Sequence, residues 1–230
     1  MKKISVLIAC YNGAPFVVRA LESVFSQSLS DQTYEVVLVN DGSTDATEEV
    51  IAPYRDRPNF RLLKNAENIG LPRTCNRALE AAQGEYVIRL DADDTFDPNL
   101  LQELLGPMEK EATDFVSCDR WELSLETGER REIRIEPFNL FRLIAIGTLM
   151  RRDLLLSIGG WRNLFLEEYD LYLRYLPKSG RPPVHLHRPL LTYTIRPGSM
   201  TADPARTEEG WRELRRLWPE EVLRQQGAPA

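Results

Sequence analysis

The chain has 230 residues, of which 43% are hydrophobic, and its formal net charge is −6. This length fits one large domain, or one domain with an appendage. The negative charge argues against holding nucleic acid through its phosphates, and no run approaches the roughly 18 apolar residues of a membrane span. The three cysteines are widely spaced and form no zinc or disulfide pattern, so we expect a reducing, cytoplasmic setting. His185 and His187 are the only histidines, and we expect a structural role for each.

The first hundred residues alternate short apolar runs with amphipathic segments. Apolar runs rich in β-branched residues predict buried strands, and apolar positions at helical spacing predict helices. The expected strands are 4–9, 35–39, 60–63 and 86–90. The expected helices start near Pro15, after Asp45 with Glu48 as its capping-box partner, and at Leu71, the last ending at Gly84. Repeated strand–helix units predict parallel strands with right-handed crossovers, a doubly wound α/β half.

After residue 97 the pattern becomes mixed. The expected elements are a hairpin around 126–129, a helix at 167–176 and strands at 184–187 and 191–195. In the tail from residue 206, Trp211, Leu214 and Trp218 fall on one helical face, which is typical of a docking face, and Pro219 breaks or restarts the helix. We expect this half to continue the same sheet.

Asp91, Asp93 and Asp94 follow the fourth expected strand directly. Side chains two residues apart in extended backbone point to one side, so Asp91 and Asp93 would repel unless a cation lay between them. Ligands of open α/β sheets collect beyond the carboxyl ends of strands. The pattern predicts a divalent metal that holds a phosphorylated ligand. The alternative is a turn, because aspartate also caps turns and helices.

A second polar turn, 40–45, ends the second expected strand. Asp41 there could accept hydrogen bonds from a ligand such as a pyrimidine ring, and the alternative is a solvated turn before a capped helix. A calcium loop is excluded, because Ala46 and Ala52 stand where that loop needs Gly and Glu. The motifs of dehydrogenases, P-loop NTPases and α/β-hydrolases are also absent from the sequence.

Several short motifs occur in order along residues 3–201. They are 5–13, 40–45, 67–71, 84–86, 89–94, 159–161, 167–174 and 193–201. Together they resemble the family 2 glycosyltransferases, which are inverting enzymes of the GT-A fold. The resemblance implies an α/β protein in which a Rossmann-like parallel sheet is continued by a mixed α+β acceptor half. It implies one GT-A domain at 1–205, with a nucleotide-sugar-binding half at 1–97 and an acceptor half at 98–205, and a helical tail at 206–230.

The resemblance also implies how the donor is held. Donor contacts are implied for Ala9, Tyr11, Asp41, Asn68, Arg73, Asp91 and Ala92. Tyr11 would stack on the nucleotide base, and Asp41 would accept from a pyrimidine. Asp93 would coordinate Mn²⁺ or Mg²⁺ on the diphosphate, and Asp91 would contact the ribose or the metal. Such an ion stabilises the charge that develops on the departing nucleoside diphosphate.

A base is implied at the start of the helix at 167–176. Family members carry a Glu-Asp pair there, and this chain carries Glu167 and Glu168. The resemblance makes Glu168 the base that deprotonates the acceptor hydroxyl. Glu167 and Asp170 are the alternatives, and acidic residues also favour a first helical turn for electrostatic reasons alone.

The chain departs from the family at Arg196, where many members carry a histidine. Arginine cannot ligate a metal but could bind a phosphate directly. The processive Q-x-x-R-W signature is absent. We therefore expect the transfer of a single sugar from a UDP- or dTDP-sugar to a glycan, lipid-linked or small-molecule acceptor. The alternative is a sugar-nucleotide-binding protein that has lost catalysis and acts as a sensor or partner subunit. Peripheral membrane contact and a homodimer stay open.

Overall fold

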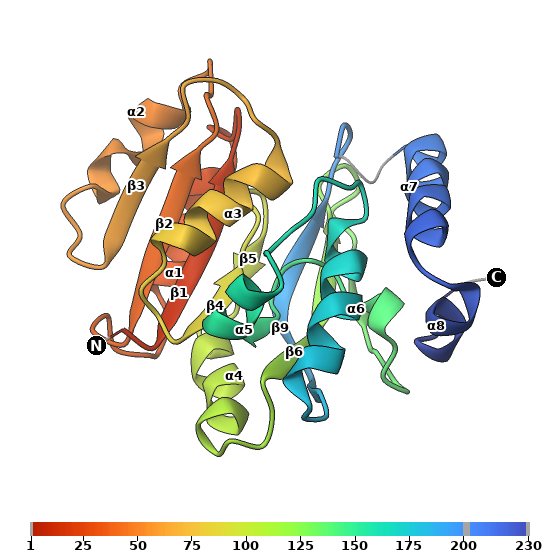
Figure 1. Cartoon of the computed structure of the whole chain (residues 1–230). Coiled ribbons are helices and arrows are strands. Elements are labelled where there is room, and N and C mark those ends of the chain that lie inside the picture. The colour runs from red at the N-terminus through yellow and green to blue at the C-terminus, as the bar shows by residue number, and fades with distance from the viewer. Residues whose placement is uncertain (1, 200–202, 229–230) are drawn as a thin grey trace.

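The computed structural model describes residues 2–199 and 203–228. Within these ranges the strands form one nine-stranded sheet in the order β3-β2-β1-β4-β8-β6-β9-β5, with β7 paired to β6 (Figure 1). The strands are β1 (Ile4–Cys10), β2 (Tyr34–Asn40), β3 (Phe60–Lys64), β4 (Tyr86–Arg89), β5 (Thr95–Phe96), β6 (Phe115–Ser124), β7 (Arg130–Ile133), β8 (Leu149–Arg151) and β9 (Val184–Ile195). The helices are α1 (Val17–Phe25), α2 (Thr47–Ile51), η1 (Ala52–Tyr54), α3 (Leu71–Ala81), α4 (Leu100–Glu109), η2 (Leu140–Arg142), α5 (Arg152–Ser157), α6 (Glu167–Ser179), α7 (Pro204–Leu217) and α8 (Glu220–Gln225).

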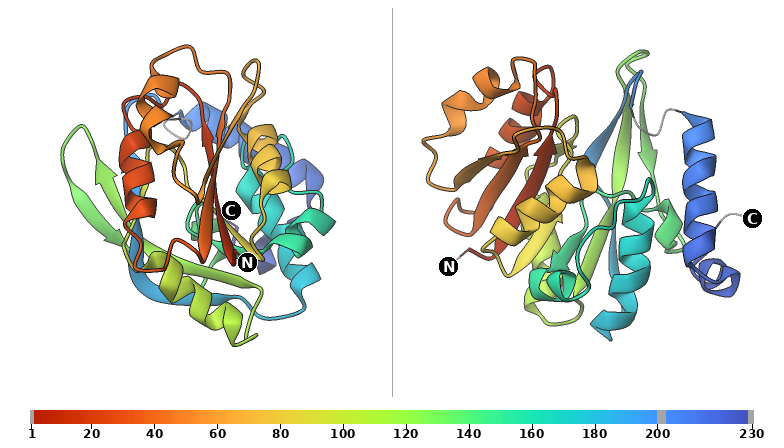
Figure 2. Two further views of the ribbon diagram at one scale, coloured as in Figure 1. Left: turned by 90° about the vertical axis from the view of Figure 1, so that its left-hand side faces the viewer. Right: turned by 45° about the horizontal axis from the view of Figure 1, so that its top comes forward.

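The first half is the predicted doubly wound unit. β1 pairs in parallel with β2 and β4, and β2 pairs in parallel with β3. Helices α1 and α3 cover opposite faces of these strands (Figure 2, left). Ile8 belongs to the core cluster that includes α1, whereas its neighbour Leu7 belongs to the cluster that includes α3. A parallel sheet covered on both faces needs continuous apolar runs, which is why these strands could be recognised in the sequence.

The second half continues the sheet with mixed pairing. The predicted hairpin is confirmed, because β6 and β7 pair antiparallel. The prediction of two strands at 184–187 and 191–195 is wrong, because β9 runs unbroken from Val184 to Ile195. Its register against β6 jumps from Leu186 opposite Cys118 to Pro189 opposite Asp119. A β-bulge accommodates Pro189 within the strand.

The predicted capping box before α2 forms only in part. The backbone N–H of Thr47 donates to Asp45 Oδ1 at 2.9 Å, so Asp45 does satisfy an N–H at the helix start. Glu48 does not complete the pair: its carboxylate meets Arg55 at 3.0 Å and Lys64 at 2.5 Å. Two cations on neighbouring elements attract this carboxylate more strongly than one backbone N–H does.

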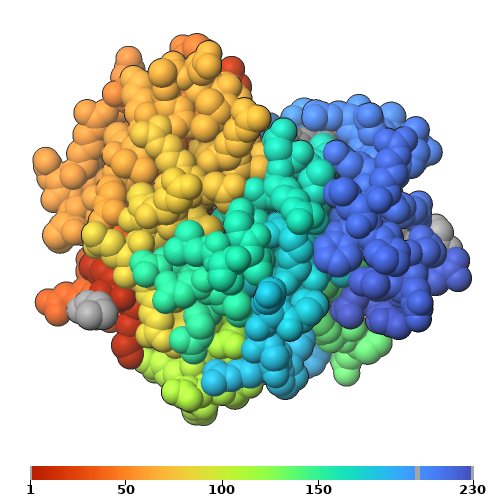
Figure 3. Space-filling model, in the orientation of Figure 1, coloured from red at the N-terminus to blue at the C-terminus, as the bar shows by residue number. Residues whose placement is uncertain are grey.

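The tail helices pack on the second half, and the stripe that the sequence predicted as a docking face lies in this contact. Trp211 stacks on Tyr169 with ring centroids 5.5 Å apart, and Leu214 is buried. The indole N–H of Trp218 donates to Asp170 Oδ1 at 3.1 Å. Figure 3 shows α7 and α8, in dark blue, against the segment of residues 140–180. In the described ranges, every helix is too short or too polar to cross a bilayer.

Candidate active site

A cavity of about 450 Å³ opens at the carboxyl ends of β1, β2 and β4. The strand order reverses at β1, and ligands of open α/β sheets bind at such a point. The start of α6 and the end of β9 form its other side. The lining residues from the sheet edge include Ala9, Tyr11, Asp41, Asn68, Asp91, Ala92 and Asp93, and those from the second half include Glu167, Glu168, Tyr193, Thr194 and Arg196.

Asp41 is buried at the cavity wall and holds the loop before α3. Its Oδ1 accepts from Asn65 Nδ2 at 2.5 Å and from the Ile69 N–H at 3.0 Å, and its Oδ2 accepts from the Gly70 N–H at 3.1 Å. A carboxylate oxygen can accept two hydrogen bonds, so Oδ2 can accept another from a ligand. Asp41 therefore positions the loop that carries Asn68 and keeps capacity for a ligand N–H.

A buried arginine joins the two halves of the cavity. Arg89, at the end of β4, donates from Nε and Nη2 to the two oxygens of Asp91 at 2.6 and 2.9 Å. Its Nη1 donates to Glu167 Oε1 at 2.8 Å. The side chains of Arg89 and Glu167 are only 3% and 4% exposed. Because a planar guanidinium can bind two carboxylates at once, Arg89 fixes the start of α6 against the end of β4.

Asp93 forms an ion pair with a second arginine, at the end of β9. Arg196 Nε lies 2.8 Å from Asp93 Oδ2, and the guanidinium stacks over the ring of Phe16 at 4.8 Å. Arg19 also binds this turn, because its Nη2 donates to the Asp93 carbonyl at 2.7 Å. Asp93 Oδ1 makes no hydrogen bond to the described residues, so one of its oxygens is available to a ligand.

Asp94 is buried and connects the acidic turn to the end of β9. The Thr194 N–H donates to Asp94 Oδ1 at 2.6 Å, which ties the end of β9 to the acidic turn. Burial, and then the nearby carboxylates of Asp91 and Asp93, raise the pKa of Asp94 well above its ordinary value. A raised pKa favours the neutral form, which reduces the negative charge in the cluster.

Three acidic residues open α6, and their surroundings differ. Glu167 is bound by Arg89, and Asp170 is buried against Arg162, Arg174 and Trp218. Glu168 lines the cavity and has no ion-pair partner among the described residues. Burial, and then the neighbouring carboxylate of Glu167, raise the pKa of Glu168 to about 8. Of the three, Glu168 has the surroundings that suit a proton acceptor near neutral pH.

The cavity gathers every residue that the sequence assigned to the donor, the metal or the base except Arg73, and of the two alternative bases its lining includes Glu167 but not Asp170. Arg73 is exposed on α3 and is not among the lining residues. The predictions from the sequence assigned no role to Arg89 or Asp94. Arg89 did carry a signal, because it stands inside an otherwise apolar run, and a buried arginine needs an anionic partner.

The acidic turn offers oxygen ligands of the kind that Mg²⁺ and Mn²⁺ prefer. These ions commonly bind to one or two carboxylates together with substrate phosphates. Asp93 has a free oxygen, whereas both oxygens of Asp91 accept hydrogen bonds from Arg89. The oxygen atoms of this turn therefore fit a metal ion that is held mainly by Asp93 and by oxygens of a bound ligand.

Solved structures identify the class of fold. The chain superposes on Staphylococcus aureus TarS 1–349 in complex with UDP-GlcNAc with a TM-score of 0.77, over 87% of this chain and 61% of that chain, at 22% identity. It superposes on the mannosyltransferase PcManGT from Pyrobaculum calidifontis, in complex with GDP-Man and Mn²⁺, with a TM-score of 0.72, over 99% and 66% of the two chains, at 19% identity. The fold is GT-A.

The sequence identifies the family. Residues 5–166 match the profile of Glycosyl transferase family 2, and the chain belongs to that family of glycosyltransferases. It is 34% identical to the putative glycosyltransferase EpsH of Bacillus subtilis over 116 residues, which are 50% of this chain and 33% of EpsH. It is 31% identical to the poly(ribitol-phosphate) beta-N-acetylglucosaminyltransferase TarS of Staphylococcus aureus over 185 residues, which are 78% of this chain and 31% of TarS. The chain spans about a third of the length of these two relatives.

Proposed function

We propose that this protein transfers a single sugar from a nucleoside diphosphate sugar to an acceptor hydroxyl, with inversion at the anomeric carbon. The observation that carries the proposal is the carboxylate of Glu168, which has no ion-pair partner among the described residues, has a pKa raised to about 8, and lines the same cavity as the acidic turn. A proton acceptor and a diphosphate site on facing walls are what a direct displacement requires.

The residues of the sheet edge would hold the donor. Tyr11, which is 49% exposed at the rim, would stack on the base, and Asp41 Oδ2 would accept from a ring N–H of a uracil or thymine. Asn68 and Ala92 would contact the rest of the nucleotide. Arg196 would exchange its contact with Asp93 for a diphosphate oxygen, because guanidinium binds phosphate at least as well as carboxylate.

Asp93, with help from Asp91, would hold Mn²⁺ or Mg²⁺ against the diphosphate. When bound, the ion would offset the negative charge that develops as the nucleoside diphosphate leaves. The mannosyltransferase structure with GDP-Man and Mn²⁺ supports a divalent ion in a site of this fold. It also makes guanine donors worth testing beside the UDP and dTDP donors that Asp41 favours.

Glu168 would perform the proton transfer. The acceptor oxygen forms a bond to the anomeric carbon while the bond from that carbon to the diphosphate oxygen breaks, and the acceptor proton passes to Glu168. Attack from the face opposite the leaving group inverts the anomeric centre. Arg89 holds Glu167 and Asp91 but not Glu168, so the base stays free of a fixed cation.

The experiment measures sugar release from a panel that includes UDP-GlcNAc, GDP-Man and dTDP-glucose, with Mn²⁺ or with EDTA. We expect turnover of one donor that EDTA and Asp93→Ala both suppress. Full activity of Asp93→Ala would remove the metal role of this residue. NMR of the product measures the anomeric configuration, and retention would contradict direct displacement.

The second candidate is a sugar-nucleotide-binding protein without catalysis. The observation in its favour is the ion pair between Arg196 and Asp93, which occupies one oxygen of the expected metal ligand. Calorimetry separates the two candidates. Nucleotide-sugar binding with no turnover of any donor, with or without Mn²⁺, would establish the second.

A further inference from the structure

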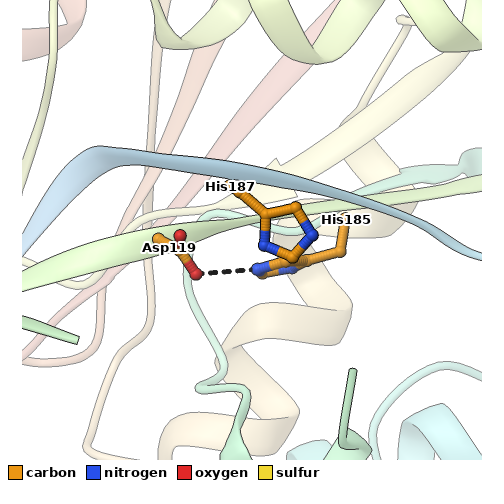
Figure 4. A group of neighbouring side chains, drawn as sticks. All are labelled: Asp119, His185 and His187. Carbon is orange, nitrogen blue, oxygen red and sulfur yellow. Dashed lines mark hydrogen bonds and ion pairs between the residues drawn. The ribbon is translucent and has the colours of Figure 1, made fainter. Parts of the chain in front are cut away.

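A second group of metal-ligating side chains lies away from the cavity, on β6 and β9. Asp119 comes from β6, and His185 and His187 come from β9 (Figure 4). Each of the three offers one ligand atom, and these atoms all lie within 4.8 Å of one another. In a tetrahedral zinc site the ligand atoms lie about 3.3 Å apart, given bonds of about 2.0–2.1 Å. Small side-chain rotations would close this group around an ion.

The β-bulge in β9 brings the group together. Ser117 stands opposite His185, and the register then jumps so that His187 and Arg188 have no partner on β6. Bulges commonly re-aim a side chain at functional sites. The ring of His187 lies 5.2 Å from that of His185, on the same side of the strands as the carboxylate (Figure 4).

One carboxylate oxygen of Asp119 is unsatisfied. Oδ1 accepts from the Ile135 N–H at 2.8 Å and lies 2.9 Å from His185 Nε2. Oδ2 is buried and has no hydrogen-bond partner among the described residues. A carboxylate kept for hydrogen bonding alone would be expected to satisfy both oxygens. The side chain of Asp119 is 1% exposed, so bulk water does not supply the missing partner.

Ser117 is buried and contacts the other ring nitrogen of His185. Its Oγ lies 2.9 Å from His185 Nδ1. Metal-bound histidines almost always donate their other ring N–H to an oxygen, which fixes the ring and leaves the lone pair of the ligating nitrogen toward the metal. With Nδ1–H donating to Ser117, Nε2 would face the ion, on the side where Asp119 lies.

We propose that Asp119, His185 and His187 form a transition-metal site, separate from the donor cavity, that binds Zn²⁺ or a similar imidazole-preferring ion. Two imidazoles and one carboxylate favour such ions over Mg²⁺ or Ca²⁺. His187 is exposed, so a water completes the coordination. The ion joins β6 to the bulge of β9 and, through Asp119, to Ile135. The sequence predicts a structural role for the two histidines, and the proposal gives them a ligand role instead.

The test uses the full chain, stripped with a chelator and titrated with Co²⁺ in the absence of nucleotide. We expect one equivalent of Co²⁺ to produce the visible d–d absorption of a site with nitrogen ligands, and Zn²⁺ to abolish it. His187→Ala removes an exposed ligand and should weaken Zn²⁺ binding by more than the roughly 10–100-fold that loss of an outer-shell partner costs. Ser117→Ala should fall within that roughly 10–100-fold range.

Two controls separate this site from others. Arg188→Ala changes the neighbouring exposed residue of the same bulge, which pairs with Glu103, and should bind Zn²⁺ like the wild type. Asp93→Ala alters the proposed donor-site ligand and should keep the Co²⁺ spectrum. Unchanged Zn²⁺ affinity in His187→Ala, a spectrum lost in Asp93→Ala, or no absorption in the wild type would each overturn the proposal. The melting temperatures of the metal-free variants confirm that each is folded.

Discussion

Two acidic clusters contribute residues to the cavity lining, one at the end of β4 and one at the start of α6, and in each of them some carboxylates are bound by arginine whereas one has a raised pKa. At the end of β4, Asp91 and Asp93 each meet a guanidinium, and buried Asp94 has a raised pKa. At the start of α6, Glu167 and Asp170 are bound by arginines, and Glu168 is left without an ion-pair partner among the described residues. A carboxylate that an arginine binds has its charge compensated by the protein, whereas burial without a bound cation favours a carboxylate that can take up a proton. The environment of each group, not its identity, therefore sets its proposed role.

The largest effect is expected at Glu168. The Glu168→Gln variant keeps the shape of the side chain but cannot accept a proton, so kcat should fall by about 10²–10⁴, the usual contribution of a general base. Initial rates at saturating donor and acceptor measure it. Nucleotide affinity should stay unchanged, because Glu168 belongs to the acceptor side. A kcat equal to that of the wild type would assign the base to another residue.

Arg89 connects the two clusters, so its removal should destabilise both of them. Arg89→Met leaves the buried carboxylate of Glu167 and the partly exposed carboxylate of Asp91 without their cation. We expect a loss of about 3–5 kcal/mol in the free energy of unfolding, as for a broken buried ion pair. The matched control is Arg196→Met, whose partly exposed pair with Asp93 should cost about 0–1 kcal/mol. Urea unfolding measures both.

A double-mutant cycle checks the cause. If unpaired charge destabilises Arg89→Met, then adding Glu167→Gln should recover part of the loss, because one of the two uncompensated carboxylates becomes neutral. Strict additivity of the two substitutions would show that packing, rather than charge, explains the loss.

The pH dependence of activity and of stability gives a second test of Glu168. Because the pKa of Glu168 in the free protein is raised to about 8, log kcat/KM should rise with a slope of about one below that pH and level off above it. The free energy of unfolding should change in the opposite direction and fall as the pH rises. The folded pKa lies above the ordinary value of 4.5, so the stabilisation from protonated Glu168 is complete below about pH 4.5 and is lost as the pH rises through about 8.

The comparison variant for both measurements is Glu168→Gln, which has no proton to lose. The difference in free energy of unfolding between wild type and this variant should shift against the wild type between about pH 4.5 and 8. A pH-independent difference would mean that the folded protein leaves the pKa of Glu168 unperturbed.

The parallel half and the order of the motifs could be predicted from the sequence, because strands buried on both faces must be continuously apolar. The two-residue β5 and three-residue β8 could not. Such short strands exist only because distant partners pair with them, as Thr95 does with Thr192. The position of the candidate site residues that follow strands was also predictable, because ligands of open α/β sheets bind beyond the carboxyl ends of strands. The ion pair of Arg89 with Glu167 was not, because it depends on how α6 docks.

A smaller effect than that of Arg89→Met is expected at the outer edge of the α6 cluster. Trp218 donates its indole N–H to Asp170, so Trp218→Phe keeps an aromatic ring but removes one hydrogen bond to a buried carboxylate. We expect a loss of about 1.5–3 kcal/mol at most, since Arg174 and Arg162 still bind Asp170. Because Asp170 lies outside the cavity lining, kcat should stay near that of the wild type while the melting temperature falls. A large loss of kcat at unchanged stability would instead place Asp170 beside Glu168 in the proton transfer, and the α6 cluster would then hold two functional acids rather than one.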